Sequence, residues 1–334
     1  MTERRCIYCG RLADLDKDAL FRLPPDHGRV NDAVYRRFLA SRGIEGVRAE
    51  LPAVCGKQSP DFSKIEWENG KPVLVTKTGR STDTLICPSC HNELFRDTES
   101  GSVRSAVFFG EKDSGKTSLI LALAGKCITR QFSPDERFRY ILNDRICDAE
   151  SIVGAAKSIE EGGKPSDLRE PIAVYRVSSA AEGGTAECDV MHDASESDTG
   201  DEQAIRAAMP FADSSERYVY CIPADTLYET VLADDGRADM KMRLEMMKLL
   251  AACRYAQKPP ALMLAVTKLD TARGEITEMY RDEQTLRNYI YSAYPCIEEL
   301  APFFAEVRAF AVSAAKPEFG DCDLTGELYA GIFG

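Results

Sequence analysis

Residues 110–117 read Gly110-Glu111-Lys112-Asp113-Ser114-Gly115-Lys116-Thr117, a Gly-x-x-x-x-Gly-Lys-Thr motif. The apolar stretch 103–109 precedes this motif, and residues 118–124, also largely apolar, follow it. A strand, a glycine-containing loop and a helix in this order predict a phosphate-binding loop. Backbone N–H groups can turn inward onto a polyphosphate only where small residues permit the close approach, and the helix N-terminus adds partial positive charge.

The side chains of this loop have distinct expected roles. Lys116 is expected to reach the β- and γ-phosphates and to take part in catalysis, and the Thr117 hydroxyl is expected to bind Mg²⁺. A chance glycine turn is the alternative, but the strand and the helix stand in the right places on either side. We therefore assign nucleotide binding to Gly110, Asp113, Ser114, Gly115, Lys116, Thr117 and Ser118.

The composition is that of an ordinary globular protein with an acidic balance. Of the 334 residues, 44% are hydrophobic, and 42 Lys and Arg stand against 54 Asp and Glu, a formal net charge of −12. The chain as a whole therefore lacks the excess of basic residues that is typical of nucleic-acid-binding proteins. No apolar run is long enough to cross a bilayer, and no apolar signal core follows Met1, so we expect a cytoplasmic protein.

Four of the twelve cysteines stand in pairs with the spacing of metal ligands. Cys6 and Cys9 form one Cys-x-x-Cys pair, and Cys87 and Cys90 form the other. Two such knuckles supply the four thiolates of a tetrahedral structural Zn²⁺ site. Because the pairs lie much farther apart than usual, the segment between them is interpreted as an insertion. A redox dithiol or four unrelated buried cysteines are the alternatives.

The insertion contains two predicted elements, a helix over residues 31–41 and a hairpin over residues 64–78 that turns at Asn69-Gly70. His27 and His91 could replace a cysteine ligand, but a lone histidine beside a knuckle is more often not a ligand. The arginines between residues 29 and 48 form a locally basic stretch, which fits a solvated helix face better than a contact with an acidic partner or nucleic acid.

From residue 103 onward, strand and helix patterns alternate, as is typical of a mostly parallel α/β sheet. The segments 172–178 and 185–192 follow each other without a helix between them, which predicts one antiparallel hairpin. The predicted strands occupy residues 103–109, 172–178, 185–192, 217–223, 261–266 and 307–312, and the predicted helices occupy residues 116–127, 136–161 and 239–255, with a last helix after residue 321.

This hairpin after the first helix resembles the Ras-like GTPases of the translation-factor class, whereas generic phosphate-loop ATPases keep a parallel order here. Thr267-Lys268-Leu269-Asp270, at the end of a predicted strand, resembles their base-recognition motif. The Asp270 carboxylate would accept both N1–H and the exocyclic amine of guanine, an arrangement that adenine lacks. Lys268 would lie over the ring and Thr267 would brace the motif. Ser313-Ala314 resembles the final loop of the family, where the Ala314 N–H would meet guanine O6.

The third family motif departs from the pattern. Asp193-Ala194-Ser195-Glu196 stands where the family has Asp-x-x-Gly, so the resemblance implies that Asp193 holds Mg²⁺ while Glu196 replaces the glycine. Ser197 stands where a glutamine would orient water, which implies slow or partner-assisted hydrolysis. Residues 198–201 offer an alternative frame for this motif, and the alternative interpretation of Asp193 is that it merely ends a strand. Ser166 is the expected first-switch hydroxyl on Mg²⁺.

Together these motifs predict two domains. Residues 1–100 are expected to form a zinc-ribbon-like module with a long insertion. Residues 101–334 are expected to form a P-loop GTPase domain, a three-layer α/β/α fold with a mostly parallel sheet and one antiparallel edge strand. The resemblance implies a GTP/GDP switch with a protein partner, and the knuckles with the atypical third motif are most similar to bacterial GTPases of the double-GTPase, conflict-system type. An assembly component that binds nucleotide without useful hydrolysis is the alternative.

Overall fold

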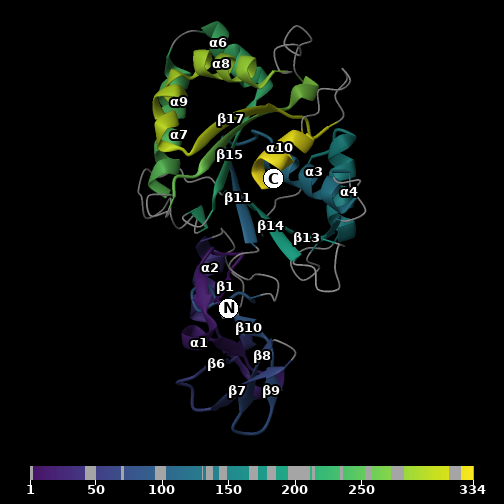
Figure 1. Cartoon of the computed structure of the whole chain (residues 1–334), viewed down its shortest axis with the longest axis vertical. Helices are drawn as coiled ribbons and strands as arrows, with labels where there is room; N and C mark the ends of the chain where they lie inside the picture. The colour runs from purple at the N-terminus through teal and green to yellow at the C-terminus, as the bar shows by residue number, and fades with distance from the viewer. Residues whose placement is uncertain are drawn as a thin grey trace. The chain divides into compact units, whose positions relative to one another are not determined.

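The computed structural model of the chain describes residues 3–41, 50–68, 71–94, 103–129, 131–132, 138–142, 149–164, 172–178, 186–194, 211–212, 215–233, 236–252, 258–271, 282–315 and 325–333. The chain forms two compact units, Met1–Val103 and Arg104–Gly334 (Figure 1).

In the first unit, the described residues form short antiparallel strands that make up four small sheets. The strands pair in the orders β1-β2, β10-β3-β6, β4-β5 and β7-β8-β9. Their bounds are β1 Glu3–Arg5, β2 Leu12–Asp14, β3 Leu20–Arg22, β4 Arg29–Asn31, β5 Glu50–Pro52, β6 Val54–Gly56, β7 Phe62–Glu68, β8 Lys71–Thr76, β9 Ser81–Thr82 and β10 Leu85–Ile86. Two helices accompany them, α1 Leu15–Asp18 and α2 Ala33–Ser41.

Both elements predicted inside the insertion are confirmed. The expected helix is α2, which begins at Ala33 because the Asp32 carboxylate caps it. The expected hairpin is the antiparallel pair of β7 and β8, whose last partners are Glu68 and Lys71. Asn69-Gly70 lies outside the described residues.

The second unit is organised by a seven-stranded sheet in the order β12-β13-β14-β11-β15-β16-β17. Strands β11, β15, β16 and β17 run parallel, and β13 pairs antiparallel with both β14 and β12. The bounds are β11 Val103–Phe109, β12 Phe138–Leu142, β13 Ile172–Ser178, β14 Ala186–Asp193, β15 Arg217–Pro223, β16 Ala261–Thr267 and β17 Glu306–Ala311. All six predicted strands are therefore present, including the antiparallel hairpin β13–β14.

The single helix predicted over residues 136–161 is wrong in its first part. Residues 138–142 form strand β12, and the helix α4 occupies only Ala149–Glu160. The segment Phe-Arg-Tyr-Ile-Leu is rich in aromatic and branched residues, which suit a strand, and it pairs with β13 along the length of the segment. Strand β12 therefore lies outside β13 and takes the sheet edge.

Helices cover both faces of the sheet, which gives the three-layer α/β/α arrangement (Figure 1). In β11, Ala106 and Phe108 pack on one side and Val107 and Phe109 on the other, because successive side chains of a strand point to opposite faces. On the first side lie α3 Lys116–Ile128, α4 and α10 Thr325–Phe333. On the second side lie α6 Ala224–Ala233, α7 Arg237–Ala252, α8 Glu283–Ala293 and α9 Pro295–Leu300.

The centre of the sheet is buried on both faces. Every residue of β16 is buried, as expected for a parallel strand between two helical layers. In such sheets ligands collect beyond the carboxyl ends of the strands. None of the described helices is long and apolar enough to cross a membrane.

Candidate functional site

The phosphate loop leaves β11 at Phe109 with a backbone that requires glycine. Gly110 has φ +141° and Gly115 has φ +86°, and Asp113 between them has φ +60°. A Cβ at Gly110 would lie 2.6 Å from the carbonyl oxygen of Cys221 in β15 and 2.9 Å from Ser114 Oγ. The turn is therefore closed to any other residue at position 110, and it delivers the chain into α3 at Lys116.

Two polar side chains of this loop are buried in a way that suits an anionic ligand. Lys116 is 8% exposed, and its Nζ donates to the carbonyl oxygens of Gly110 at 2.8 Å and Glu111 at 2.7 Å. Among the described residues, the buried Ser114 Oγ has no hydrogen-bond partner. Burying a hydroxyl without a hydrogen-bond partner costs folding free energy. The Ser114 hydroxyl is therefore well placed to donate to an acceptor on a ligand, such as a phosphate oxygen.

The two described residues expected to hold Mg²⁺ lie together. The Thr117 hydroxyl donates to Asp193 Oδ2 at 2.5 Å, across from the first turn of α3 to the last residue of β14. The next residue, Ala194, donates its N–H to the Phe108 carbonyl at 2.9 Å, which fixes the end of β14 beside β11. A hydroxyl and a carboxylate are oxygen ligands of the kind Mg²⁺ prefers. Ser166 and Glu196, like residues 195–201 as a whole, lie outside the described residues.

The segment 267–270, which the sequence predicts to recognise the base, contacts the phosphate loop. Thr267 Oγ1 donates to the Ser114 carbonyl oxygen at 2.6 Å, so the end of β16 is joined to the loop directly. Lys268 turns the chain with φ +58°. The following Asp270 accepts a hydrogen bond on Oδ1 from Ser313 Oγ at 3.0 Å. The two motifs that the sequence placed 43 residues apart are thus side by side.

A cavity of about 410 Å³ lies beside these motifs. This volume is in the range of small-molecule sites. Its walls come from the start of α3, the two base loops and one further segment at the end of α4. The lining residues are Gly115, Ser118, Leu119, Ile159, Gly162, Gly163, Lys164, Thr267, Lys268, Asp270, Val312, Ala314 and Ala315. Sequence reasoning missed the α4 segment, because the Gly162-Gly163 pair signalled only a helix end.

In the first unit, the four knuckle cysteines lie together. Cys6 Sγ is 3.5 Å from Cys90 Sγ, Cys9 Sγ is 3.6 Å from Cys87 Sγ, and all four sulfurs lie within 4.8 Å of one another. Sulfurs bound tetrahedrally to one Zn²⁺ at about 2.3 Å are about 3.8 Å apart. The cluster therefore has the size of a four-thiolate metal site, and the interpretation as four unrelated cysteines is wrong.

The two knuckles have the same backbone structure. In the first, the Gly10 N–H donates to the Cys6 carbonyl at 2.8 Å, and in the second the His91 N–H donates to the Cys87 carbonyl at 2.9 Å. Gly10 and His91 both have positive φ. Burial raises the pKa of the Cys6 thiol. Four clustered thiolates, three of them on buried cysteines, are therefore held together only when a cation offsets the cost of their charge.

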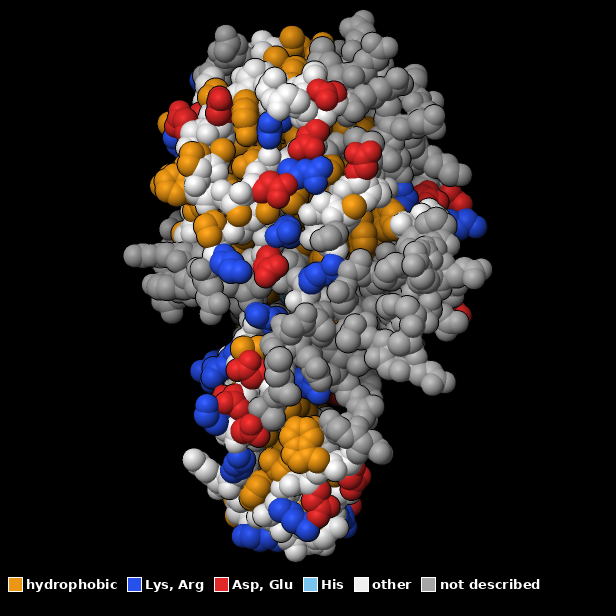
Figure 2. Space-filling view, viewed as in Figure 1, with side chains coloured by type: hydrophobic (Ala, Val, Ile, Leu, Met, Phe, Trp, Pro, Cys, Tyr) orange, Lys and Arg blue, Asp and Glu red, His pale blue; other side chains and the backbone are white. Residues whose placement is uncertain are grey.

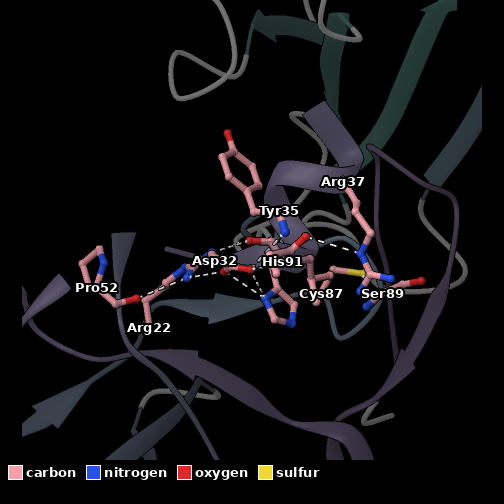
Figure 3. Close-up of polar contacts among 10 residues, drawn as sticks. Arg22, Asp32, Tyr35, Arg37, Pro52, Cys87, Ser89 and His91 are labelled. Carbon is pink, nitrogen blue, oxygen red and sulfur yellow. Dashed lines mark hydrogen bonds and ion pairs between the residues drawn. The ribbon is translucent and has the colours of Figure 1, made fainter. Parts of the chain in front are cut away.

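His91 is held by a buried carboxylate (Figure 3). Its Nδ1 lies 2.9 Å from both carboxylate oxygens of Asp32, and Arg22 Nη1 lies 2.6 Å from Asp32 Oδ2. Asp32 Oδ1 also accepts the Tyr35 N–H at 3.0 Å and so caps α2. Burial raises the pKa of Asp32, but hydrogen bonds from Tyr35, His91 and Arg22 outweigh that effect and lower it overall. Neither His91 nor His27 belongs to the cysteine cluster.

The sequence matches no protein-family model and no curated protein. Some solved structures are similar at a low level. The ADP-ribosylation factor-like GTP-binding protein (Sar1) of Encephalitozoon cuniculi, in complex with GDP, is 12% identical with a TM-score of 0.33, over 69% of this chain and 79% of that chain. The signal recognition particle receptor complex SRb-GTP/SRX of Chaetomium thermophilum is 16% identical with a TM-score of 0.36. The match covers 65% of this chain and 92% of that chain. The GTP-bound GTPase-like domain of S. cerevisiae Ski7 is 14% identical with a TM-score of 0.35. The match covers 69% of this chain and 49% of that chain.

Likeness at this level carries no weight of its own, so the fold is assigned from the sheet. The sheet is mostly parallel with an antiparallel hairpin of β13 and β14, and a phosphate loop lies between β11 and α3, as the hairpin pattern and the motifs predicted. The second unit has the three-layer fold of a phosphate-loop GTPase.

Proposed function

We propose that this chain is a Mg²⁺-dependent GTP-binding switch. In this proposal residues 101–334 are the GTPase domain, and residues 1–100 are a zinc-ribbon-like module. The observation that carries the proposal is the convergence of the phosphate loop, Asp193 and Asp270 at one end of the sheet, with Thr267 joining loop and base motif. Guanine preference is assigned to Asp270, with Ser313 orienting its carboxylate and Ala314 N–H donating to O6.

The phosphate end is assigned to the loop residues. Lys116 and Ser114 would donate to phosphate oxygens, and Thr117 with Asp193 would hold Mg²⁺, joined by Ser166 from the first switch. The bound ion would neutralise charge on the β- and γ-phosphates. The preformed contact between Thr117 and Asp193 supports this assignment, because it already places two oxygen ligands at one point.

Hydrolysis of GTP to GDP and phosphate is proposed to be slow or partner-assisted. Lys116, Asp193 and Glu196 are the catalytic candidates, and Glu196 and Ser197 stand where the family has glycine and glutamine. The alternative is an assembly protein that binds nucleotide without useful hydrolysis, which the same departure favours. Single-turnover hydrolysis with and without the cognate partner separates the two, since no turnover in either case supports the binding protein.

We further propose that the four cysteines bind one structural Zn²⁺, and that the protein is a regulatory component of a multiprotein bacterial system in the cytoplasm. The compact Cys6, Cys9, Cys87 and Cys90 cluster supports the metal. A protein is the proposed partner rather than a nucleic acid. On the face shown in Figure 2, Lys and Arg side chains are mixed with Asp and Glu side chains over the described part of the second unit, so no single-sign patch covers it.

The experiment for the base is a comparison of guanine and adenine nucleotides on the purified chain. For the metal it is elemental analysis, in which about one zinc per chain is expected. Loss of that zinc is expected when Cys87 and Cys90 are both changed to Ser. Retention of the zinc by this variant would contradict the site.

A further inference from the structure

One wall of the nucleotide cavity belongs to none of the sequence motifs. Ile159, Gly162, Gly163 and Lys164 at the end of α4 line the cavity together with the base loops and the start of α3. The base loops and the phosphate loop already account for the two ends of a nucleotide. A third wall at the same cavity is therefore in a place to meet the part between them, the ribose.

The geometry of this wall is fixed by two glycines. The N–H of Gly162 donates to the Ile159 carbonyl at 2.9 Å, and the N–H of Gly163 donates to the Ser158 carbonyl at 2.8 Å. Gly162 has φ +86°, so these bonds form the Schellman turn that ends many helices. A Cβ at Gly163 would lie 2.4 Å from Ser158 Oγ and 2.8 Å from the Ser158 carbonyl oxygen. The turn directs the chain to Lys164 on the cavity.

The helix that ends in this turn is held firmly on α3, beside which it lies in Figure 1. A Cβ at Gly125 in α3 would come within 2.6 Å of Ala156 Cβ, so the two helix backbones approach closely at that point. Ile152 and Ile159 of α4 are buried in the same core as α3. Since α3 begins at the phosphate loop, the turn is positioned relative to the phosphates by rigid packing.

Lys164 is an exposed residue at this wall. Within the described part of the chain, Lys164 has neither an ion pair nor a side-chain hydrogen bond. The carbonyl end of a helix carries partial negative charge, so α4 does not favour a phosphate here, in contrast to the N-terminus of α3. The phosphates are expected at the phosphate loop and the N-terminus of α3, so the ribose hydroxyls are the acceptors that remain for the Lys164 ammonium at this wall.

We propose that the terminal turn of α4 is the ribose wall of the cavity and that Lys164 Nζ donates a hydrogen bond to a ribose hydroxyl of the bound nucleotide. The inference rests on the proposed nucleotide binding. It adds a binding residue that lies outside every motif, and it gives Gly162-Gly163 a role beyond ending the helix.

The first test is affinity labelling of the full chain with periodate-oxidised GDP, whose 2′,3′-dialdehyde takes the place of the ribose diol. An amine that meets an aldehyde forms an imine with loss of water, and cyanoborohydride reduces the imine to a stable secondary amine. We expect the label to be attached to Lys164, and we expect excess GDP to compete with the reagent and so decrease the extent of labelling. Lys157, which is exposed on the same helix away from the cavity, should stay unlabelled. A label that is confined to Lys268, or one on Lys164 that GDP does not reduce, would overturn the proposal.

The second test compares GDP with 2′,3′-dideoxy-GDP by equilibrium titration. In the wild type, removal of both hydroxyls should weaken binding about 3- to 10-fold, the size expected of one partly exposed charged hydrogen bond. Lys164→Ala should lose the same factor for GDP and bind both nucleotides alike, while Lys157→Ala should behave as wild type. If wild type binds no GDP, the proposed function itself fails. If it does and Lys164→Ala still discriminates fully, only the ribose assignment fails.

Discussion

Asp270 is the residue on which the base preference of the proposed site depends. Its Oδ1 accepts from Ser313 Oγ at 3.0 Å, which orients the carboxylate at the cavity. Asp270→Asn replaces one acceptor with an N–H donor, which clashes with the donors of guanine but matches the 2-oxo group of xanthine. We expect GDP affinity to fall by about 30- to 100-fold and xanthosine diphosphate to become the better ligand. Titration with both nucleotides measures this, and an unchanged preference for GDP would exclude Asp270 from base recognition.

Gly110 is the phosphate-loop residue at which any side chain would disturb the backbone most. Its φ of +141° is a conformation that L side chains rarely adopt, and an added Cβ would meet Cys221 O at 2.6 Å. Gly110→Ala should therefore lower the free energy of unfolding by about 2 kcal/mol or more and abolish tight nucleotide binding.

Gly154 provides the matched control for this substitution. It lies inside α4, and a Cβ there would meet nothing within 4 Å. Gly154→Ala should be neutral or stabilise the protein by up to about 1 kcal/mol, because alanine is the better helix former. Urea unfolding and GDP titration check both variants. Equal behaviour of the two would show that the strained loop does not limit binding.

At the scale of elements, Asp32 joins α2 to the second cysteine knuckle. Its carboxylate caps α2, pairs with Arg22 and holds His91 (Figure 3). Asp32→Ala removes the cap and leaves the buried Arg22 without its carboxylate, although Arg22 still donates to the carbonyls of Pro52 and His91. We expect the first unit to lose about 2 to 3 kcal/mol of stability at neutral pH.

The pH dependence of this contribution follows from the lowered pKa of Asp32. A lowered pKa means that the ionised form stabilises the fold above the unfolded-state value of about 4, and that this stabilisation disappears as the pH falls through the folded-state value below it. The stability difference between wild type and Asp32→Asn should therefore shrink below about pH 4. Urea unfolding at several pH values measures this difference, with Asp18→Ala at an exposed position of α1 as the control. A difference that stays constant into acid would rule out the ionised carboxylate as its cause.

The elements that sequence reasoning could predict are those with strong local patterns. A pattern of only a few residues is enough to predict the phosphate loop, the cysteine knuckles and the buried strand before Thr267. Strand β12 was not predicted, because the aromatic and branched residues of Phe138–Leu142 suit a strand but do not by themselves reveal the pairing with β13. Likewise, nothing near Gly162 indicated that the end of α4 would line a cavity with Asp270.

Contacts between distant residues escaped prediction for the same reason. Arg104 in β11 and Tyr329 in α10 both bind the buried Asp189 of β14, with Arg104 Nε donating to Oδ1 at 2.9 Å and the Tyr329 hydroxyl to Oδ2 at 2.6 Å. No local spacing links three segments so far apart in the chain. This network ties the last helix to the strand that ends at Asp193.

At the scale of the whole molecule, each of the two units buries hydrophobic residues of its own, and the sites proposed for them are expected to work independently. The variant with Cys87→Ser and Cys90→Ser should lose its zinc and much of the stability of residues 1–100. Its affinity for GDP should stay within about twofold of wild type, since every described residue that lines the cavity belongs to the second unit. Metal analysis and GDP titration on the same preparation test this, and a loss of GDP binding together with the metal would show that the two units are coupled.

The central claim is that the phosphate loop at Gly110 belongs to a guanine site, and the most direct test is the affinity of the wild-type chain for GDP and ADP in the presence of Mg²⁺. With Asp270 and Ala314 reading the base, GDP should bind at least about 100-fold more tightly than ADP, because adenine leaves both groups unpaired. Equal affinity for GDP and ADP, or binding of neither, would contradict the claim.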